Sequence, residues 1–294
     1  IDLSKAFDTL AHDKLITKLN NYGIRGNALH LISSYLSNRK QYVSVLNENS
    51  DELTVDFGVP QGSVLGPLLF ILYINDLCNI TDKGKFVLFA DDTNIFVAAG
   101  SKNEVYTMAN KVLQTVNNYM EVNLLHINVK KCCYMYFSPL RTKNDELDDD
   151  SDSHFLSINC KIIQRVSQTK FLGIIIDDRL SWKPHLTSLN MKLKSACGRI
   201  YRIKKCLPEY LHKQIYHSLF ESHLSFAISV WGGVSSNQIK PLFITQKRCI
   251  RMIFGDNASY IDKFNTSARV RPLESQRLGA DFYKKESTKP LFLK

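Results

Sequence analysis

The chain has 294 residues, of which 44% are hydrophobic and 22% charged, proportions typical of a globular protein with its own core. Its 38 Lys and Arg exceed its 28 Asp and Glu, and the formal net charge of +10 favours a polyanionic partner. The longest apolar run, residues 64–74, is too short to cross a bilayer and predicts a buried helix. The seven cysteines show no C-x-x-C pair and no zinc-finger spacing, so reduced thiols are expected.

The first half of the chain predicts short strands alternating with helices. Apolar residues at helical spacing indicate helices, β-branched runs indicate strands, and Gly and Pro mark a loop at residues 58–63. The expected elements are strands at 1–8, 41–46, 51–57 and 132–137, a hairpin at 86–97, and helices at 12–19, 27–36, 64–77 and 101–120. This order predicts an α+β fold, with a small antiparallel sheet and helices on one face.

Within the predicted hairpin, Asp91 and Asp92 stand side by side between two apolar runs. Adjacent carboxylates raise each other's pKa unless a cation lies nearby, and hard divalent ions such as Mg²⁺ prefer oxygen ligands. The pair therefore indicates either a metal site that handles phosphates or an ordinary acidic turn on a surface hairpin. Asp2, on the first predicted strand, would join the pair if the two strands are neighbours.

The second half changes in composition near Leu180. Residues 141–153 hold an acidic run that lacks the Gly and Glu of a calcium loop and predicts a solvated, mobile loop, and strands are expected at 155–166 and 169–176. After Leu180 the expected elements are helices, at 183–203, 209–219 and 239–254. The predicted domains are residues 1–180, a helical domain at 181–255 and an irregular extension at 256–294.

Basic residues accumulate on the first of these helices. They indicate either a solvated helix face or, beside a phosphate-handling metal site, a nucleic-acid track. The residues of this predicted track are Lys192, Lys194, Arg199, Arg202, Lys204 and Lys205.

Five segments of the chain stand in the order and at about the spacing of the reverse transcriptase motifs. They are IDLSKAFD, GVPQGSVLGPLLF, FADD, INVKK and KFLGIIID, and each resembles the non-LTR retrotransposon type, of which jockey is an example. The later QKRCIRMIFG resembles the thumb region of such elements. The resemblance implies a right-hand polymerase palm with partial fingers in residues 1–180 and a helical thumb in 181–255.

The resemblance also implies a catalytic centre for RNA-directed DNA polymerisation. Asp2, Asp91 and Asp92 match the family's catalytic acids, which hold two Mg²⁺ ions, with Mn²⁺ as an alternative. Lys131 matches the lysine beside the leaving pyrophosphate, although Lys130 is an alternative for that role.

Two further segments match binding elements of the family. Phe7 matches the aromatic gate that excludes a 2′-hydroxyl, and Gln61 and Gly62 match a loop that contacts nucleotide and template. Each also has a structural reading, as a core aromatic and a helix-capping loop. The segment Phe171, Leu172 and Gly173 resembles the primer grip, or alternatively is a core hairpin with a bulge.

The implied partners are an RNA template, a DNA primer and deoxynucleoside triphosphates, with no membrane. The implied locations are a cytoplasmic ribonucleoprotein and the nucleus. Because only Ile1 precedes Asp2, we expect a fragment that lacks most of its fingers and is inactive by itself. The alternatives are a retroelement remnant that binds nucleic acid without catalysis and a two-metal nuclease, which has no use for a steric gate.

Overall fold

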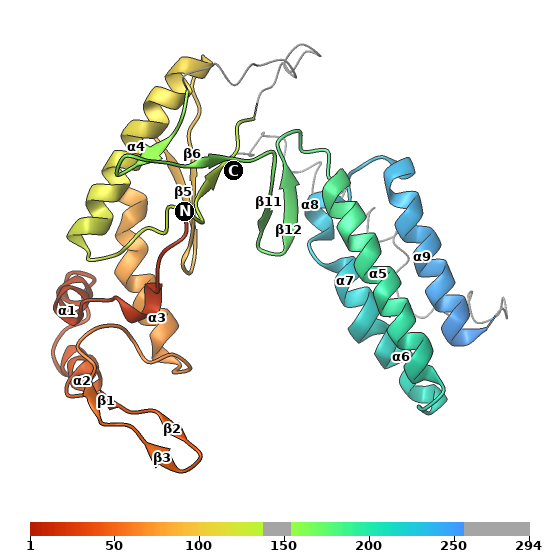
Figure 1. Ribbon diagram of the computed structural model, residues 1–294, viewed down its shortest axis with the longest axis horizontal. Helices are drawn as coiled ribbons and strands as arrows, with labels where there is room; N and C mark the ends of the chain where they lie inside the picture. The colour runs from red at the N-terminus through yellow and green to blue at the C-terminus, as the bar shows by residue number, and fades with distance from the viewer. Residues whose placement is uncertain (138–153, 256–294) are drawn as a thin grey trace. The chain divides into compact units, whose positions relative to one another are not determined.

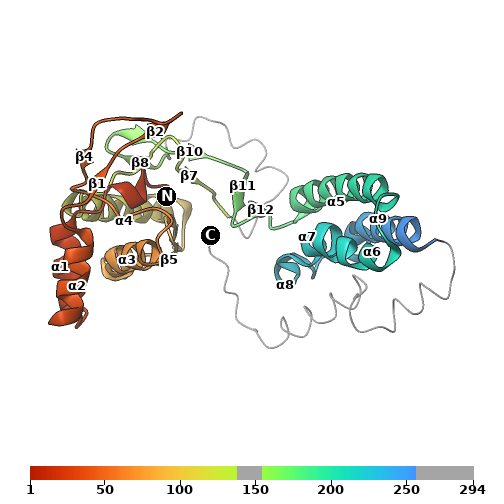
Figure 2. The ribbon, with the colours of Figure 1, turned by 90° about the horizontal axis from the view of Figure 1, so that it is seen from below.

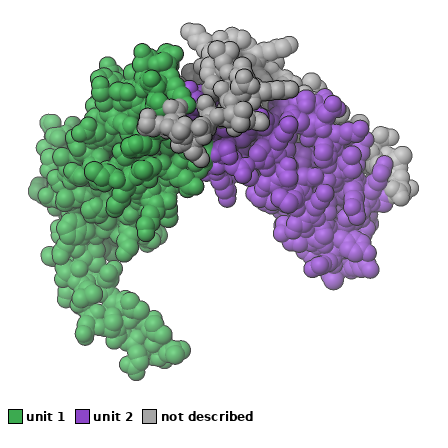
Figure 3. All heavy atoms as spheres, turned by 45° about the horizontal axis from the view of Figure 1, so that its top comes forward, with its two compact units in different colours: residues 1–134, 141–166, 292–294 green, residues 135–140, 167–291 purple. Residues whose placement is uncertain are grey.

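The computed structural model describes residues 1–137 and 154–255 (Figure 1). The acidic run predicted to form a loop and the extension predicted at 256–294 lie outside these ranges. The described residues divide into two compact units, of which the first holds residues 1–134 and 154–166 and the second holds 135–137 and 167–255 (Figure 3). The domain boundary predicted near Leu180 stays a prediction; the second unit already includes the strands that precede it.

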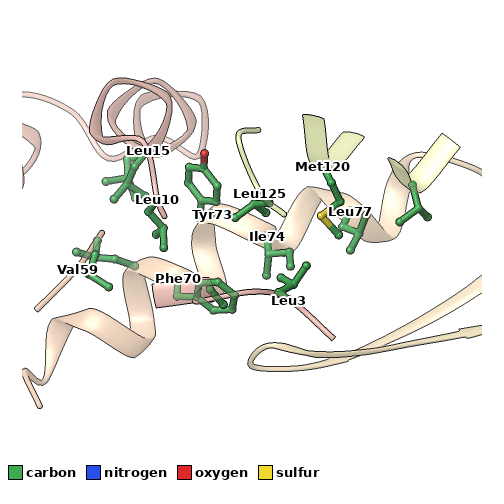
Figure 4. Packing of buried hydrophobic residues seen from close by; sticks show 14 of the residues in the cluster. Leu3, Leu10, Leu15, Val59, Phe70, Tyr73, Ile74, Leu77, Met120 and Leu125 are labelled. Atoms are coloured by element: carbon green, nitrogen blue, oxygen red, sulfur yellow. The ribbon is translucent and has the colours of Figure 1, made fainter. Parts of the chain in front are cut away.

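The first unit has four α-helices among its described residues. These are α1 (His12–Asn21), α2 (Asn27–Leu36), α3 (Leu65–Ile74), which continues as the 3-10 helix η2 (Asn75–Asn79), and α4 (Lys102–Val122). The helix α4 begins at a capping box, in which Ser101 and Glu104 each bond the other's backbone N–H. Side chains from all four helices form one apolar core, part of which Figure 4 shows around α3.

The hairpin β5 (Lys85–Phe89) and β6 (Asp92–Phe96) is the longest strand pair of the first unit. The chain's first residues lie beside it (Figure 1): the Ile1 amino group donates to Thr93 O at 2.6 Å, and Thr93 N–H donates to Ile1 O at 3.3 Å. On the other side, Leu3 forms an antiparallel bridge with Ile127. The predicted strand at 1–8 is therefore wrong: the segment holds one isolated bridge at Leu3 and then the 3-10 helix η1 (Ala6–Asp8).

The remaining predicted strands of this unit are shorter than expected. They form the pairs β1 (Lys40–Gln41) with β4 (Leu53–Thr54), β2 (Ser44–Val45) with β3 (Glu48–Asn49), β8 (Ser157–Ile158) with β9 (Lys161–Ile162), and β7 (Cys133–Tyr134) with β10 (Gln164–Arg165). The last pair is parallel, whereas the sequence predicted an antiparallel sheet. The predicted strand at 155–166 is interrupted because Asn159 and Cys160 adopt positive φ and turn the chain into a hairpin.

The second unit is a strand hairpin followed by helices. The hairpin pairs β11 (Gln168–Phe171) with β12 (Ile174–Asp177). The helices are α5 (Lys183–Lys204), α6 (Glu209–Tyr216), a π-helical segment (His217–Glu221), α7 (Ser222–Ser225), α8 (Ile228–Trp231) and α9 (Ser236–Phe254). The helices α5 and α9 lie alongside each other in Figure 2 and share a core around the fully buried Trp231. Among the described residues, no helix is both long and apolar enough to span a membrane.

Candidate active site

The acidic pair lies at the tip of the β5–β6 hairpin, as the sequence predicted. Phe89 pairs with Asp92, so Ala90 and Asp91 form a two-residue turn. Ala90 has φ 51, the left-handed region that such turns require and that usually calls for Gly or Asn. Asp91 is half-buried and Asp92 is exposed, which leaves carboxylate oxygens available to a ligand.

The structure brings Asp2 beside this hairpin, because the backbone of Ile1 is hydrogen-bonded to Thr93 of β6. Asp2 O accepts the Asn128 N–H at 2.9 Å, and Asp2 N–H donates to Cys132 Sγ at 3.5 Å. The residue is therefore held between two segments that lie far from it in the sequence. This placement agrees with the predicted approach of Asp2 to the hairpin strands.

The Asp2 carboxylate has one oxygen, Oδ2, that is buried and accepts no hydrogen bond within the described residues. The Lys131 ammonium lies 3.6 Å from this oxygen, and its side chain is 69% exposed. The Asp2 side chain as a whole is 30% exposed, and an exposed lysine at this distance compensates the charge of its buried oxygen only weakly. Of the two candidate lysines, Lys131 is thus placed within ion-pair distance of Asp2, and Lys130 is exposed.

The acidic residues match the divalent ions that the resemblance implies in chemistry but not in arrangement. Within residues 1–137 and 154–255, no three His, Cys, Asp or Glu side chains gather closely enough to hold a metal. The buried Oδ2 of Asp2, without a hydrogen-bond donor, is nevertheless the kind of atom that a cation satisfies. The chemistry of Asp2 and the acidic pair fits such an ion, although the three carboxylates are not assembled.

The loop at residues 58–63 is bonded to the segment that carries Phe7. Val59 N–H donates to Phe7 O at 2.8 Å, Gly58 N–H donates to Leu10 O at 2.8 Å, and Gln61 Nε2 donates to Asp8 Oδ1 at 2.9 Å. A side chain at Gly58 would collide with this segment, because a Cβ there would lie 2.7 Å from Phe7 O. Two segments about fifty residues apart are therefore packed backbone to backbone.

In the Phe7 segment and the loop bonded to it, one predicted binding residue packs in the core and two are exposed to solvent. The Phe7 ring is half-buried and packs on Phe70 at a centroid distance of 4.7 Å, so the expected core packing is present. Gln61 and Gly62 are exposed, and Gly62, at φ 86, has open space where a Cβ would stand. The sequence analysis missed the close backbone approach at Gly58 and the hydrogen bond that Asp8 accepts from Gln61. The available signal for a constrained backbone was the Gly-Val-Pro-Gln-Gly sequence of the loop.

The predicted primer-grip segment forms the turn of the β11–β12 hairpin in the second unit. Phe171 pairs with Ile174, and the two turn residues, Leu172 at φ 43 and Gly173 at φ 88, are both left-handed. The turn has two residues and no bulge, unlike the bulged hairpin that was one of the two alternatives.

The predicted nucleic-acid track is largely solvent-exposed. Lys204 differs, because it is half-buried and its ammonium donates to Met252 O near the end of α9. Lys204 therefore has a structural contact between two helices. The exposed members are Lys192, Lys194, Arg199, Arg202 and Lys205.

Residues 1–176 match the model of the reverse transcriptase (RNA-dependent DNA polymerase) family, and the chain belongs to this family. The match covers the acidic hairpin, the Phe7 segment and the β11–β12 turn.

Individual relatives come from mobile elements. The chain is 27% identical over 269 residues to the probable RNA-directed DNA polymerase from transposon BS of Drosophila melanogaster, covering 86% of this chain and 28% of the relative. It is 25% identical over 266 residues to the RNA-directed DNA polymerase from mobile element jockey of the same species, covering 87% and 28%. Its identity to the Pol polyprotein of the R1 retrotransposable element of Bradysia coprophila is 27% over 237 residues, covering 79% and 22%. The resemblance to non-LTR retrotransposon reverse transcriptases is thus confirmed, and the chain spans less than a third of these relatives' length.

Proposed function

We propose that this chain is the polymerising part of a retrotransposon reverse transcriptase, which adds deoxynucleotides to a primer 3′-hydroxyl on an RNA template. The proposal rests chiefly on the position of Asp2, which follows the residue that is hydrogen-bonded to Thr93 of the acidic hairpin and whose carboxylate has a buried oxygen that lacks a hydrogen bond. Family membership supports the same chemistry.

In this proposal Asp2, Asp91 and Asp92 hold two divalent ions, with Mg²⁺ the expected metal and Mn²⁺ an alternative. Bound there, the ions supply charge neutralisation for the triphosphate and lower the pKa of the attacking hydroxyl. The tip of the β5–β6 hairpin carries Asp91 and Asp92, and the backbone contacts of Ile1 with Thr93 hold the segment of Asp2 against the same hairpin. Lys131 stands next to Asp2 and donates a proton or positive charge toward the leaving pyrophosphate.

Selection of the nucleotide belongs to the Phe7 segment and the loop bonded to it. The Phe7 ring, packed on Phe70, has a fixed position from which it excludes a 2′-hydroxyl. Gln61 and Gly62 are exposed beside it and contact the nucleotide and the template strand.

The remaining assignments follow the same proposal. The first unit acts as palm with part of the fingers, the helices of the second unit act as thumb, and Phe171, Leu172 and Gly173 hold the primer. The basic residues of α5 contact the nucleic-acid backbone. The protein works in a cytoplasmic ribonucleoprotein and in the nucleus, where the element's DNA is made.

Primer extension on an RNA template with Mg²⁺ tests the proposal. The chain is measured alone and as a chimera that carries, ahead of Ile1, the upstream segment of the jockey polymerase, because this chain covers 28% of that relative. We expect extension by the chimera and its loss in the Asp91→Asn variant of the same chimera. Extension that survives Asp91→Asn contradicts the proposal, and salt-sensitive RNA binding without extension in either form favours the non-catalytic remnant.

The sugar gate has its own test in the same assay. Replacing Phe7 by Ala opens the space beneath the sugar, and we expect the preference for deoxynucleotides over ribonucleotides to fall about tenfold or more. An unchanged preference assigns Phe7 to core packing alone.

A further inference from the structure

A short turn in the first unit, residues 128–132, holds Asp2 from one side. It follows Ile127, which forms an antiparallel bridge with Leu3, and next to this bridge Asn128 N–H donates to Asp2 O at 2.9 Å. Asp2 and Asn128 therefore stand opposite each other. In a regular antiparallel ladder such a hydrogen-bonded pair exchanges two bonds, so Asp2 N–H would donate to Asn128 O.

The second hydrogen bond of this pair is replaced, because the chain turns at Asn128. The Asn128 carbonyl oxygen accepts the N–H groups of Lys131 and Cys132 instead, at 3.0 and 3.2 Å. Asp2 N–H donates to Cys132 Sγ at 3.5 Å. A thiol sulfur is a weaker acceptor than a carbonyl oxygen, and here it takes the place of the ladder carbonyl.

Cys132 is buried, with 4% of its surface exposed, whereas the next residue, Cys133, is exposed. Burial strengthens the contact between Cys132 Sγ and Asp2 N–H, since water competes less for either group. The same turn places the Lys131 ammonium 3.6 Å from Asp2 Oδ2. One turn therefore contacts the backbone oxygen, the backbone N–H and the carboxylate of Asp2.

The hydrogen bond to Cys132 limits where the Asp2 carboxylate lies. An aspartate side chain is short, so its carboxylate moves with its backbone, and the backbone of Asp2 is held by Asn128 through the oxygen and by Cys132 through the N–H. A displacement of about 1 Å at a reacting group can lower a rate by about 100-fold. Loss of one of the two backbone contacts is therefore expected to act on the chemistry of Asp2.

We propose that Cys132 is a positioning residue for Asp2: its sulfur accepts the Asp2 N–H and thereby holds the carboxylate where it takes up a divalent ion. The proposal rests on the proposed function, in which Asp2 is a ligand of that ion. Cys132 acts through Asp2 and not on the substrate.

The variants Cys132→Val and Cys132→Thr test the proposal as a pair. Valine and threonine have nearly the same shape, but threonine carries a hydroxyl that can accept the Asp2 N–H. Mn²⁺ binding to the full chain, followed by electron paramagnetic resonance, reports on the carboxylate without catalysis, and Asp2→Asn gives the baseline. We expect the dissociation constant to rise about three- to tenfold in Cys132→Val, the effect of one hydrogen bond, and to stay within about twofold of wild type in Cys132→Thr.

Primer extension by the jockey chimera gives the second measurement. In Cys132→Val we expect kcat to fall about tenfold or more while KM for the primer–template stays within about twofold, and Cys132→Thr should restore kcat. Cys132→Ala removes the same acceptor with a smaller side chain and takes the place of Cys132→Val if that variant does not fold.

Cys133→Val is the matched control, because it makes the same substitution at the next residue, which is exposed. It should change neither Mn²⁺ affinity nor kcat by more than about twofold. The melting temperatures of Cys132→Val and Cys132→Thr are measured beside them, and we expect the two to differ little, so that a difference in Mn²⁺ affinity reports on Asp2 and not on folding.

Three outcomes would overturn the proposal. Mn²⁺ affinity and kcat that are equal in Cys132→Val, Cys132→Thr and wild type remove the role of Cys132 and leave the proposed function standing. Equal losses in the two variants, with an equal fall in melting temperature, assign Cys132 to packing. Mn²⁺ binding that Asp2→Asn leaves unchanged contradicts both proposals. A difference between the two variants in Mn²⁺ binding, without primer extension by the wild-type chimera, supports the role of Cys132 and contradicts only the polymerase.

Discussion

Lys18 of α1 lies in a polar cluster formed by residues of α3, η2 and α4. Its ammonium donates to Tyr73 O at 2.6 Å, Asp76 Oδ1 at 2.7 Å and Tyr119 Oη at 3.0 Å, and its side chain is 14% exposed. Tyr119 Oη also donates to Asp76 Oδ1. Burial lowers the pKa of Lys18, although the carboxylate of Asp76 opposes that effect. One cation thus joins α1, α3 and α4 around a single polar cluster.

Replacing Lys18 by Met should lower the free energy of unfolding by about 2 kcal/mol, because the Tyr73 carbonyl and the Asp76 carboxylate lose their donor. The loss stays moderate since Asp76 is 43% exposed and water can reach it. Urea denaturation measures the change. Lys111→Met, at an exposed position on α4, is the control and should change the stability by less than about 0.5 kcal/mol. Equal effects of the two substitutions would contradict the structural role of Lys18.

Leu172 occupies a turn position that disfavours its side chain, with φ 43 in the left-handed region. Asn tolerates this conformation better, so Leu172→Asn should stabilise the chain by about 0.5 kcal/mol or more. The control is Ile162→Asn. Ile162 is an exposed strand residue whose φ is not positive, so Asn brings no backbone advantage there and should lower the stability. Thermal unfolding of both variants decides the matter, and a lower melting temperature for Leu172→Asn would show that the leucine contacts outweigh the backbone strain.

At the scale of elements, the contact between η1 and the loop at residues 58–63 depends on one glycine. Gly58 has φ 81, and a Cβ there would lie 2.7 Å from both Phe7 O and Asp8 Cα, which are backbone atoms that cannot rotate away. The close approach positions Phe7 against the loop that carries Gln61.

Gly58→Ala should destabilise the first unit by about 2–4 kcal/mol, because it adds a backbone collision to an unfavourable φ. Gly62→Ala is the matched control, since Gly62 has φ 86 but open space around the added Cβ. It should cost only about 1 kcal/mol, the backbone term alone. Chemical denaturation separates the two, and similar losses at both glycines would mean that the loop moves away from η1 without difficulty.

The elements show what local sequence can and cannot predict. The helix α2 has the predicted bounds and α4 nearly so, because their apolar residues recur at helical spacing and Ser101 and Glu104 form a cap. The strand predicted at 155–166 is wrong as one continuous strand, because Asn159 and Cys160 adopt left-handed φ and turn the chain; Asn159, a residue that tolerates this conformation, was the available signal. In the candidate site, too, local features were predictable and long-range contacts were not. The acidic hairpin was predictable from its flanking apolar residues. The hydrogen bond between Gln61 and Asp8 joins positions 53 residues apart, and no local pattern encodes it.

At the scale of the whole molecule, tyrosines in both units keep their protons to unusually high pH. Burial raises the pKa of Tyr73 to about 12 and raises that of Tyr119, Tyr134 and Tyr216 further. In the unfolded chain a tyrosine ionises near pH 10. The native state therefore binds more protons than the unfolded state above that pH, and this contribution to stability is complete below pH 10 and declines as the pH rises.

We expect the urea midpoint to fall steadily above about pH 10, with tyrosinate absorbance rising in two stages as exposed and then buried rings ionise. The lowered pKa of Lys18 acts in the opposite direction just below 10.5, but one lysine opposes four tyrosines. Tyr119→Phe should reduce the decline, while Tyr210→Phe, at a ring that is 75% exposed, should leave it unchanged. A midpoint that is flat from pH 9 to pH 11.5 would contradict the burial of these hydroxyls.

The bonds between η1 and its loop have a consequence for how such an element changes over generations. The segments that carry Phe7 and Gln61 are joined by hydrogen bonds, so a substitution that displaces the backbone of one segment displaces the other. Under the proposed function, the first residue sets tolerance for ribonucleotides and the second sets the fit of template to incoming base. An inherited substitution that admits ribonucleotides by displacing this backbone would then also raise the number of copying errors. New copies of the element would accumulate mutations and, because they contain ribonucleotides, would be more easily hydrolysed.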